Sequence, residues 1–385
     1  MPPPPFRVLL CTLAGVLAGL VVPLAHAQDL LIGQVSSQTS PVTAVNAKGL
    51  YAGMNVYFSH INANGGIDGR TIKLINKDDQ LIPGKMTELT MEFIADKNVL
   101  ALAGYQNTAG ITELAKKNIP GEGGIAMISP FQGDKGIVSA ANFFPFRTGY
   151  PDEVVAMIKE ALLTEKKKVV VVYQSATYGP AMMQLAQELS KREGLNVVSY
   201  VKMDTTAQAK LDAVIKEAVV AVAKESPDAV MLLLGGRPAP ELVKQLRNSP
   251  AESAQLYLMS VVPAADVVKA AGETKARGIV ITQAVPFPFS ATLPLVREYQ
   301  KLMKLYAPEE QFSFSTLEGF VTAKITVEAL KRASPNPTRE KVLKAISNMG
   351  ELDLGGVYVN YSPKARNGWG GVDLVVIGAG GRLLR

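Results

Sequence analysis

A single stretch, residues 30–75, carries the strongest secondary-structure signal: LLIGQVSSQTSPVTAVNAKGLYAGMNVYFSHINANGGIDGRTIKLI. It begins with Leu30–Val35, an apolar run of strand length, and ends with a second such run, Thr71–Ile75. Between them, apolar side chains recur at the spacing of one helix face; they are Leu50, Met54, Tyr57, Phe58 and Ile61. The run Asn62–Gly66 then supplies residues that tolerate the positive φ angles at which helices end. The stretch therefore predicts a β-strand, a helix and a second β-strand in succession.

The same alternation continues along the chain. Further strands are expected at Val99–Ala103, Ile125–Ile128, Lys168–Tyr173, Leu195–Tyr200, Ala229–Leu234 and Ile279–Ala284. Strands that alternate with helices across short connections are typical of parallel sheets covered by helices on both faces. The rhythm is interrupted near Phe143–Asp152 and restarts after Pro151. We therefore predict an α/β fold with two lobes, which agrees with a length of 385 residues.

The N-terminus has the pattern of a secretory signal peptide. The first residues, MPPPPFR, carry one positive charge, an apolar run follows from Val8 to Leu24, and Ala25-His26-Ala27 offers a cleavage site before Gln28. A membrane anchor is the alternative, because the apolar run approaches the length of a spanning helix. Pro23 and the small residues favour cleavage. Residues 1–27 are therefore assigned to a signal peptide, and no membrane insertion of the mature chain is expected.

Composition excludes several classes of function. The chain has one Cys and two His, and removal of the signal peptide leaves only His60. Thiol nucleophiles, disulfide scaffolds and Cys/His metal sites are therefore excluded, and we expect no metal and no cofactor. The formal net charge of +6 is spread along the chain, and the basic run Lys166–Lys168 is interpreted as a solvated helix end. No nucleic-acid partner is expected.

The motifs that suggest catalysis are weak. Asp78 and Asp79 are adjacent at a strand end, where neighbouring side chains point to opposite faces, so they are not expected to act as a pair. Two glycine-rich runs, Gly121–Gly124 and Gly378–Gly381, lack the spacing of a phosphate-binding loop. A Ser-His-Asp arrangement would need His60, which lies on a helix among core-facing neighbours. An enzyme that uses Asp78, Asp79 or Glu122 as acid or base is kept as an alternative to a binding protein.

A set of short runs in a fixed order is more specific. They are Ile32-Gly33-Gln34-Val35, HINANGGIDGR from His60 to Arg70, Lys77-Asp78-Asp79, Met127–Pro130, Phe146-Arg147 and Thr177–Pro180. With these runs, essentially the whole mature chain resembles the periplasmic solute-binding proteins of branched-chain amino-acid ABC importers. The resemblance implies a type I periplasmic binding fold. Such a fold has two Rossmann-like lobes, each a mostly parallel sheet flanked by helices, joined by a three-crossover hinge. Lobe 1 would comprise 28–148 plus 282–350, and lobe 2 would comprise 149–281 plus 351–385.

Open α/β sheets bind ligands beyond the carboxyl ends of their strands, so the site is expected in the loops that follow them. The residues expected to bind the ligand are Ser37, Val45, Gln106, Asn107, Thr108, Phe131, Gln132, Gly133, Tyr178, Arg237 and Ser260. The resemblance implies that the hydroxyl of Thr108 and backbone N–H groups after Pro130 hold a ligand carboxylate. It also implies that Tyr178 covers the ligand, although a tyrosine that only packs on the rim of its lobe is the alternative.

The chain departs from the family pattern at two places. In the first loop, where the family often has an aromatic residue before a glycine, this chain has Val45-Asn46. In the second lobe, the family has a tyrosine and a glutamate that receive the ligand's ammonium. This chain has Gly235-Gly236-Arg237 and Val261-Val262-Pro263 at those places. A buried ammonium without an acceptor costs on the order of several kcal/mol. We therefore hypothesise a small carboxylate or related acid rather than an ordinary α-amino acid. Arg237 would be a second anion contact or would point to solvent.

The resemblance implies a periplasmic protein that captures a small amino-acid-like or carboxylate ligand between its lobes by hinge closure. The loaded protein would then deliver the ligand to the permease subunits of an ABC transporter, without catalysis. A ligand-sensing domain that presents the bound solute to a signalling partner is the alternative.

Overall fold

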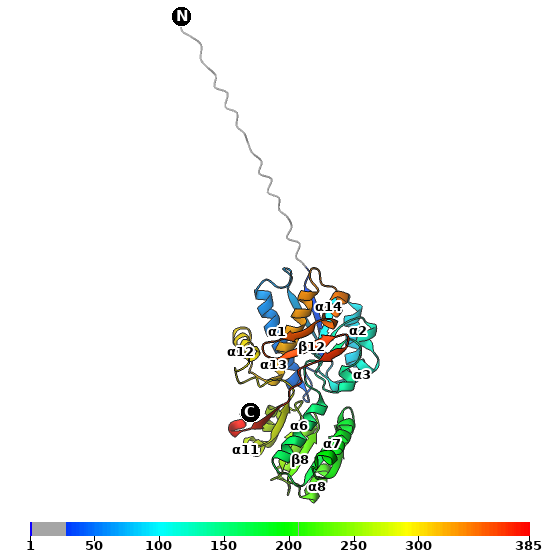
Figure 1. The fold of residues 1–385 in the computed structure, drawn as a ribbon, viewed down its shortest axis with the longest axis vertical. Helices are drawn as coiled ribbons and strands as arrows, with labels where there is room; N and C mark the ends of the chain where they lie inside the picture. Colours follow the sequence, from blue (N-terminus) through cyan, green and yellow to red (C-terminus); the bar gives the residue numbers. More distant parts are fainter. Residues whose placement is uncertain (2–27, 207) are drawn as a thin grey trace.

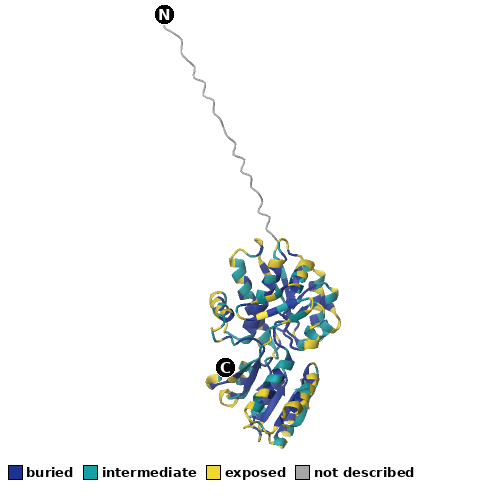
Figure 2. Ribbon diagram, viewed as in Figure 1, coloured by how far each residue is buried: buried dark blue, intermediate teal, exposed yellow. Residues whose placement is uncertain are grey.

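The computed structural model describes Met1 and residues 28–206 and 208–385. The expected signal peptide falls on residues 2–27, outside the described part of the chain. Two α/β lobes lie one above the other in Figure 1. Buried residues are concentrated on the sheets and on the inner faces of the helices, whereas exposed residues lie toward the outside (Figure 2).

The first lobe is built on a parallel sheet with the strand order β2-β1-β3-β4-β5. Its strands are β1 (Leu30–Ser36), β2 (Ile72–Asp78), β3 (Val99–Ala103), β4 (Met127–Ile128) and β5 (Phe143–Phe144). Its helices are α1 (Ala44–Ala63), α2 (Lys85–Ala95), α3 (Thr108–Lys116), α4 (Ile119–Glu122), α5 (Lys135–Val138), α12 (Pro294–Tyr306), α13 (Phe314–Arg332) and α14 (Arg339–Ser347). The strand, helix and strand predicted in residues 30–75 are therefore confirmed as β1, α1 and β2.

Helices α1 and α13 pack backbone against backbone because glycines line their contact. A Cβ atom at Gly53 would overlap the carbonyl oxygen of Thr316, and one at Gly319 would overlap the carbonyl oxygen of Leu50. Ser313 caps α13, since its side chain accepts a hydrogen bond from the backbone N–H of Thr316 at 3.1 Å. The helix is buried along most of its length. It therefore forms a rigid central element of the first lobe.

The second lobe is built on a sheet with the order β15-β14-β10-β9-β8-β6-β7. Strands β6 to β10 are parallel to one another, whereas β14 pairs antiparallel with both β10 and β15. Its strands are β6 (Val169–Gln174), β7 (Val197–Met203), β8 (Ala229–Leu233), β9 (Gln255–Leu258), β10 (Val280–Gln283), β14 (Asp373–Ile377) and β15 (Leu383–Leu384). Its helices are α6 (Tyr150–Leu163), α7 (Gly179–Glu193), α8 (Leu211–Glu225), α9 (Pro238–Leu246), α10 (Ala264–Ala271) and α11 (Glu273–Ala276). The valine run of β6 is fully buried between helices, as apolar runs in parallel sheets usually are.

The chain passes between the lobes three times, at residues 145–149, 284–293 and 368–372. Before the third crossover, β11 (Gly350–Asp353), β12 (Tyr358–Ser362) and β13 (Ala365–Asn367) form a small antiparallel sheet. The sequence-based division placed 351–385 in the second lobe. In the structure, however, Val359 and Tyr361 pack in the same core as Leu30 of the first lobe, and only residues after the third crossover join the second sheet.

Candidate functional site

The loops that follow the strands of the two sheets face each other, and they touch at several points. The amide of Asn46, in the first turn of α1, donates a hydrogen bond to the carbonyl oxygen of Val261 at 3.2 Å. On the hinge side, Arg147 Nη2 donates to Ser260 Oγ at 2.8 Å. The junction between the lobes is therefore bounded by α1 on one side and by the first crossover on the other.

A group of polar residues, all buried except the partly buried Ser260, lies at this junction and is here called the inter-lobe cluster. It consists of Gln132, Arg147, Tyr150, Glu153, Tyr178, Ser260 and Glu318. The Arg147 side chain is 2% exposed, and its guanidinium lies over the ring of Phe131, 4.0 Å from the ring centroid. Its Nε is 3.7 Å from Glu318 Oε1, which belongs to α13. The rings of Tyr150 and Tyr178 contact each other with centroids 4.4 Å apart.

Glu153 organises the second-lobe side of this cluster. Its carboxylate accepts hydrogen bonds from the backbone N–H and the hydroxyl of Ser260, both at 2.8 Å, and from the hydroxyl of Thr282. The carboxylate therefore joins the start of α6 to the ends of β9 and β10. Because these donors occupy both of its oxygens, Glu153 fixes the loops and has little remaining capacity for a ligand.

Other members of the cluster carry buried polar atoms that have no hydrogen-bond partner among the described residues. These atoms are Gln132 Nε2, Arg147 Nε and Nη1, the hydroxyls of Tyr150 and Tyr178, and Glu318 Oε1. A buried polar group left without a hydrogen bond costs about 1–3 kcal/mol, so folded proteins normally satisfy such groups. Several of them at one junction indicate a place where another molecule supplies the missing donors and acceptors.

Burial also sets the protonation states of the cluster. Burial raises the pKa of Glu318 to about 7. Repulsion from Glu153 adds to this rise, and the attraction of Arg147, which lowers the pKa, is too weak to cancel it. Burial likewise raises the pKa of Tyr150 to about 12 and that of Tyr178 well above its ordinary value. Burial alone would lower the pKa of Arg147, but the attraction of the Glu318 and Glu153 carboxylates outweighs it and raises that pKa. At neutral pH the cluster thus holds a charged guanidinium, neutral tyrosines and a carboxyl group near its midpoint.

The structure brings together five of the eleven residues expected from the sequence. Phe131, Gln132, Gly133, Tyr178 and Ser260 lie in or against the inter-lobe cluster. Gly133 is required there, because a Cβ atom at this position would collide with the ring of Tyr150.

Other expected residues have side chains that are committed to the protein itself. Asp79, which is fully buried, accepts hydrogen bonds from Ser37 Oγ at 2.5 Å and from Asn107 Nδ2 at 2.7 Å. Asn107 also caps α3, and Gln106 accepts a long 3.4 Å hydrogen bond from the backbone N–H of Ser37. Thr108, at the start of α3, is partly buried. Ser37, Gln106 and Asn107 therefore shape the first-lobe loops.

Replacing Ser37 by alanine tests this structural role. The Ser37→Ala variant leaves a buried carboxylate of Asp79 with one donor fewer, and we expect it to lose about 1–2 kcal/mol of its free energy of unfolding. Urea denaturation measures this loss, with Ser253→Ala, at an exposed position, as the control. Unchanged stability together with a large loss of ligand affinity would instead place the Ser37 hydroxyl on the ligand.

The remaining two expected residues also lie outside the cluster, and both are exposed. The Val45 side chain is 47% exposed. The Arg237 side chain is 50% exposed, and its Nη2 lies 3.9 Å from Asp212 on α8. Arg237 therefore belongs to the surface of the second lobe, and of the two interpretations made from the sequence the structure favours the solvent-facing one.

Sequence reasoning missed Tyr150, Glu153 and Glu318, and it gave Arg147 no role in the site. The available signal for Glu318 was an isolated acidic residue within the otherwise uncharged run FSTLEGFVTA. Its position changes the argument about the ligand's ammonium. Gly235–Arg237 and Val261–Pro263 provide no acidic side chain, but Glu318 places a buried carboxyl group on the first-lobe side of the junction, 3.7 Å from Arg147 Nε.

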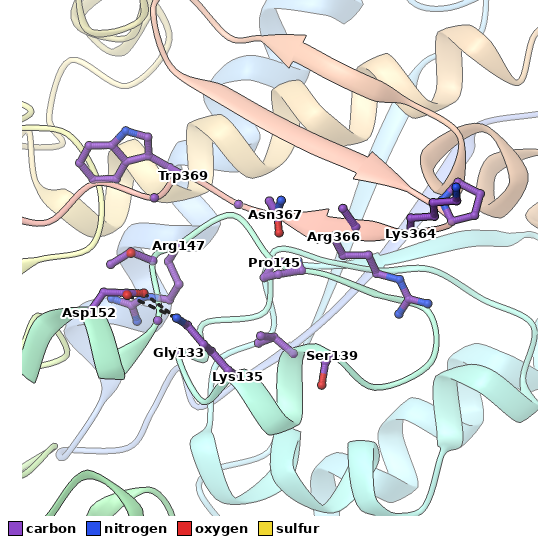
Figure 3. Close-up of a pocket in the computed structure, with 17 residues that line it drawn as sticks. Gly133, Lys135, Ser139, Pro145, Arg147, Asp152, Lys364, Arg366, Asn367 and Trp369 are labelled. Atoms are coloured by element: carbon purple, nitrogen blue, oxygen red, sulfur yellow. Dashed lines mark hydrogen bonds and ion pairs between the residues drawn. The ribbon is translucent and has the colours of Figure 1, made fainter. Parts of the chain in front are cut away.

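A hollow, here called the hinge pocket, lies beside the first and third crossovers and has a volume of about 880 Å³. It is lined by residues within 133–139, 145–152 and 363–370. Figure 3 shows Trp369 and Asn367 of the third crossover region on one side and Lys135, Asp152 and Arg147 on the other. Lys135 Nζ and Asp152 Oδ2 are 3.2 Å apart, so this ion pair joins α5 of the first lobe to α6 of the second.

The described residues contain no group of three His, Cys, Asp or Glu side chains that could hold a metal ion. Among the same residues, no helix has the length and apolar character needed to cross a membrane.

This architecture and site can be compared with known proteins. The model of the family described as "Periplasmic binding protein" matches residues 30–381. The chain belongs to this family. The type I fold and the resemblance to periplasmic solute-binding proteins expected from the sequence are therefore confirmed. A search of curated protein sequences found no match.

Several solved structures are similar to this chain. An extracellular ligand-binding receptor from Verminephrobacter eiseniae is 27% identical, with a TM-score of 0.84 over 93% of this chain and all of that one. A substrate-binding periplasmic protein from Ralstonia solanacearum is also 27% identical, with a TM-score of 0.84 over 92% of this chain and 99% of that one. A possible leucine/isoleucine/valine-binding protein from Rhodopirellula baltica, at 24% identity and a TM-score of 0.81 over 94% and 97% of the two chains, shares the fold.

Proposed function

We propose that this periplasmic binding protein is the solute-binding component of an ABC importer. It is exported by a cleaved signal peptide and captures a small amino-acid-like or carboxylate ligand between its lobes. Closure of the hinge encloses the ligand, and the loaded protein then delivers it to a membrane permease. The ligand leaves chemically unchanged.

The inter-lobe cluster is the observation that carries this proposal. Its unpartnered atoms come from both sides of the junction, since Gln132 and Glu318 belong to the first lobe and Tyr178 to the second. A ligand that bonds to both sides has a higher affinity for the closed arrangement than for the open one, and this difference in affinity drives closure. A micromolar dissociation constant corresponds to about 8 kcal/mol, which a few directed hydrogen bonds in a dry cleft can supply.

The chemistry of the unpartnered atoms indicates the class of ligand. The amide of Gln132, the guanidinium of Arg147 and the tyrosine hydroxyls are donors, and together they suit a carboxylate. Glu318 Oε1 is an acceptor that suits an ammonium or a hydroxyl group on the same molecule. The paired rings of Tyr150 and Tyr178 add an apolar wall. The ligand is thus a small carboxylate, and an amino or hydroxyl group beside the carboxylate would satisfy Glu318.

The identity of the ligand can be tested on the purified mature chain. Mass spectrometry identifies any co-purified solute, and a thermal-shift panel of amino acids, hydroxy acids, keto acids and aromatic acids follows. A true ligand raises the melting temperature in proportion to its occupancy. No response to any of these classes would contradict the proposal, as would conversion of the ligand during incubation.

Tyr178→Phe tests the proposed contact directly. Because it removes one buried hydroxyl that would bond to the ligand, we expect the dissociation constant to rise about fivefold with little change in stability. Isothermal titration calorimetry measures the dissociation constant, with Tyr358→Phe, at an exposed position on β12, as the control. Equal affinities for both variants would place the ligand away from Tyr178.

A cellular assay separates transport from sensing. Deletion of the gene should abolish uptake of the identified solute, because the permease would then receive no loaded protein. Normal uptake together with loss of a transcriptional response to that solute would favour the ligand-sensing alternative.

A further inference from the structure

The hinge pocket is separate from the junction at which the proposed ligand lies. Its walls come from the loop that leads into α5, the first crossover, the start of α6 and the segment around β13. Among the described residues, none from the second-lobe loops at 175–178, 235–237 or 260–263 lines it. The pocket and the inter-lobe cluster share only Arg147, along with neighbouring Gly133.

The pocket is electropositive. Lys135, Arg147, Lys364 and Arg366 line it, and Asp152 is the one acidic residue among the described residues of its wall. Asp152 is paired with Lys135, and Arg147 is paired with Glu318, which lies outside the pocket. Among the described residues that line the pocket, this leaves Lys364 and Arg366 without a neutralising carboxylate. Arg366 is held in place, because Nη1 donates to the carbonyl oxygen of Ala140 at 2.6 Å and its guanidinium lies 5.5 Å from the ring centroid of Phe144.

Two buried residues that line this pocket carry donors without a hydrogen-bond acceptor. Within the described part of the chain, Arg147 Nε and Nη1 have no hydrogen-bond acceptor, and neither has the hydroxyl of Thr148, a residue that is 3% exposed. Both residues belong to the first crossover and line the hinge pocket. Figure 3 places Arg147 beside Gly133 and the Lys135–Asp152 pair, across from Trp369.

We propose that the hinge pocket is a second binding site, which takes a small organic oxyanion at Arg147 and Thr148. A guanidinium forms strong, charge-assisted hydrogen bonds with carboxylate and phosphate oxygens. The volume of about 880 Å³ is within the range of small-molecule sites. Trp369 offers an aromatic surface for the body of the anion. Because the walls come from both lobes, an occupant would bridge the hinge.

The sequence provides a built-in reporter for this site. Trp369 is the only tryptophan in the chain, and it lines the pocket. The mature chain, residues 28–385, is titrated with sodium acetate, sodium benzoate and sodium phosphate at constant ionic strength, with sodium chloride as the reference. We expect the oxyanions to change Trp369 fluorescence with saturation, whereas chloride does not. Comparison of acetate and benzoate with phosphate identifies the oxyanion that the pocket prefers.

Variants of the pocket locate the bound anion. Thr148→Val and Lys364→Gln should each weaken binding about fivefold, because each removes one polar contact. Gly370→Glu should weaken it further, since the position faces open space at the pocket wall and the new carboxylate repels an anion. Arg147→Lys should weaken binding about tenfold or more. Lys301→Gln, which lies on a different surface hollow, should bind like the unaltered chain.

Two results would overturn the proposal. One is the absence of a saturable fluorescence change with any of the oxyanions. The other is a saturable fluorescence change that is kept in the pocket variants Thr148→Val, Lys364→Gln and Gly370→Glu but lost in Tyr178→Phe. That pattern would place the anion between the lobes. Neither result bears on the capture of a ligand by the inter-lobe cluster, which the Tyr178→Phe calorimetry tests separately.

Discussion

A Gly53→Ala variant is expected to lose about 3 kcal/mol or more of its free energy of unfolding. The added Cβ would overlap the carbonyl oxygen of Thr316, which is backbone and cannot rotate away. Helices α1 and α13 must then separate, and the core that they share with β1 and β3 loses contacts. The intrinsic helix preference of alanine over glycine, about 1 kcal/mol, acts in the opposite direction but is too small to compensate.

Urea denaturation followed by circular dichroism measures the effect of Gly53→Ala. The matched control is Gly370→Ala, where no atom lies within 4 Å of the added Cβ, so a change of less than about 0.5 kcal/mol is expected. Equal stabilities for the Gly53→Ala variant and the unaltered chain would show that α1 and α13 are not in backbone contact.

The second large effect concerns the pH dependence of stability through Glu318. Its pKa is about 7 in the folded protein, whereas an unperturbed glutamate has a model value of 4.5. At pH values between 4.5 and about 7, Glu318 keeps its proton in the folded state but has released it in the unfolded state. The stabilisation is therefore complete below about pH 4.5 and is lost as the pH rises through about 7. A difference of this size corresponds to about 3 kcal/mol.

Glu318→Gln should remove this dependence, because glutamine resembles the protonated carboxyl and does not titrate. Relative to the variant, the unaltered chain should lose about 3 kcal/mol of its free energy of unfolding between pH 4.5 and 8. Urea titrations at both pH values measure the difference. Glu310→Gln, at an exposed position, should instead follow the unaltered chain at both pH values. Parallel pH profiles for Glu318→Gln and the unaltered chain would mean that Glu318 ionises normally.

The fold was largely predictable from the sequence because its signals are local. The apolar stripe Leu50, Met54 and Phe58 repeats at the helical period, and the β-branched run Val169–Val172 is typical of a buried strand in a covered sheet. The small sheet β11–β13 was harder to place. Its alternation indicates strands, but only the burial of Val359 and Tyr361 against the first-lobe core shows which lobe it joins.

The candidate site was less predictable because it depends on side chains that are distant in the sequence. Loop position alone drew attention to Ser37 and Asn107, but it could not show that both bond to Asp79. In the same way, Glu318 is one acidic residue in the middle of a long helix. Nothing in the periodicity of α13 indicates that this residue meets Arg147, which reaches it from the first crossover.

The glycine contact between α1 and α13 also affects how the two halves of the molecule can part. Asn46 on α1 bonds to Val261 of the second lobe, and Glu318 on α13 pairs with Arg147 of the first crossover. Since the two helices are in backbone contact at Gly53 and Gly319, they must move together as one rigid body. We therefore expect the Asn46–Val261 and Glu318–Arg147 contacts to break together. A bound solute would then be released in a single opening step, not by gradual opening from one side.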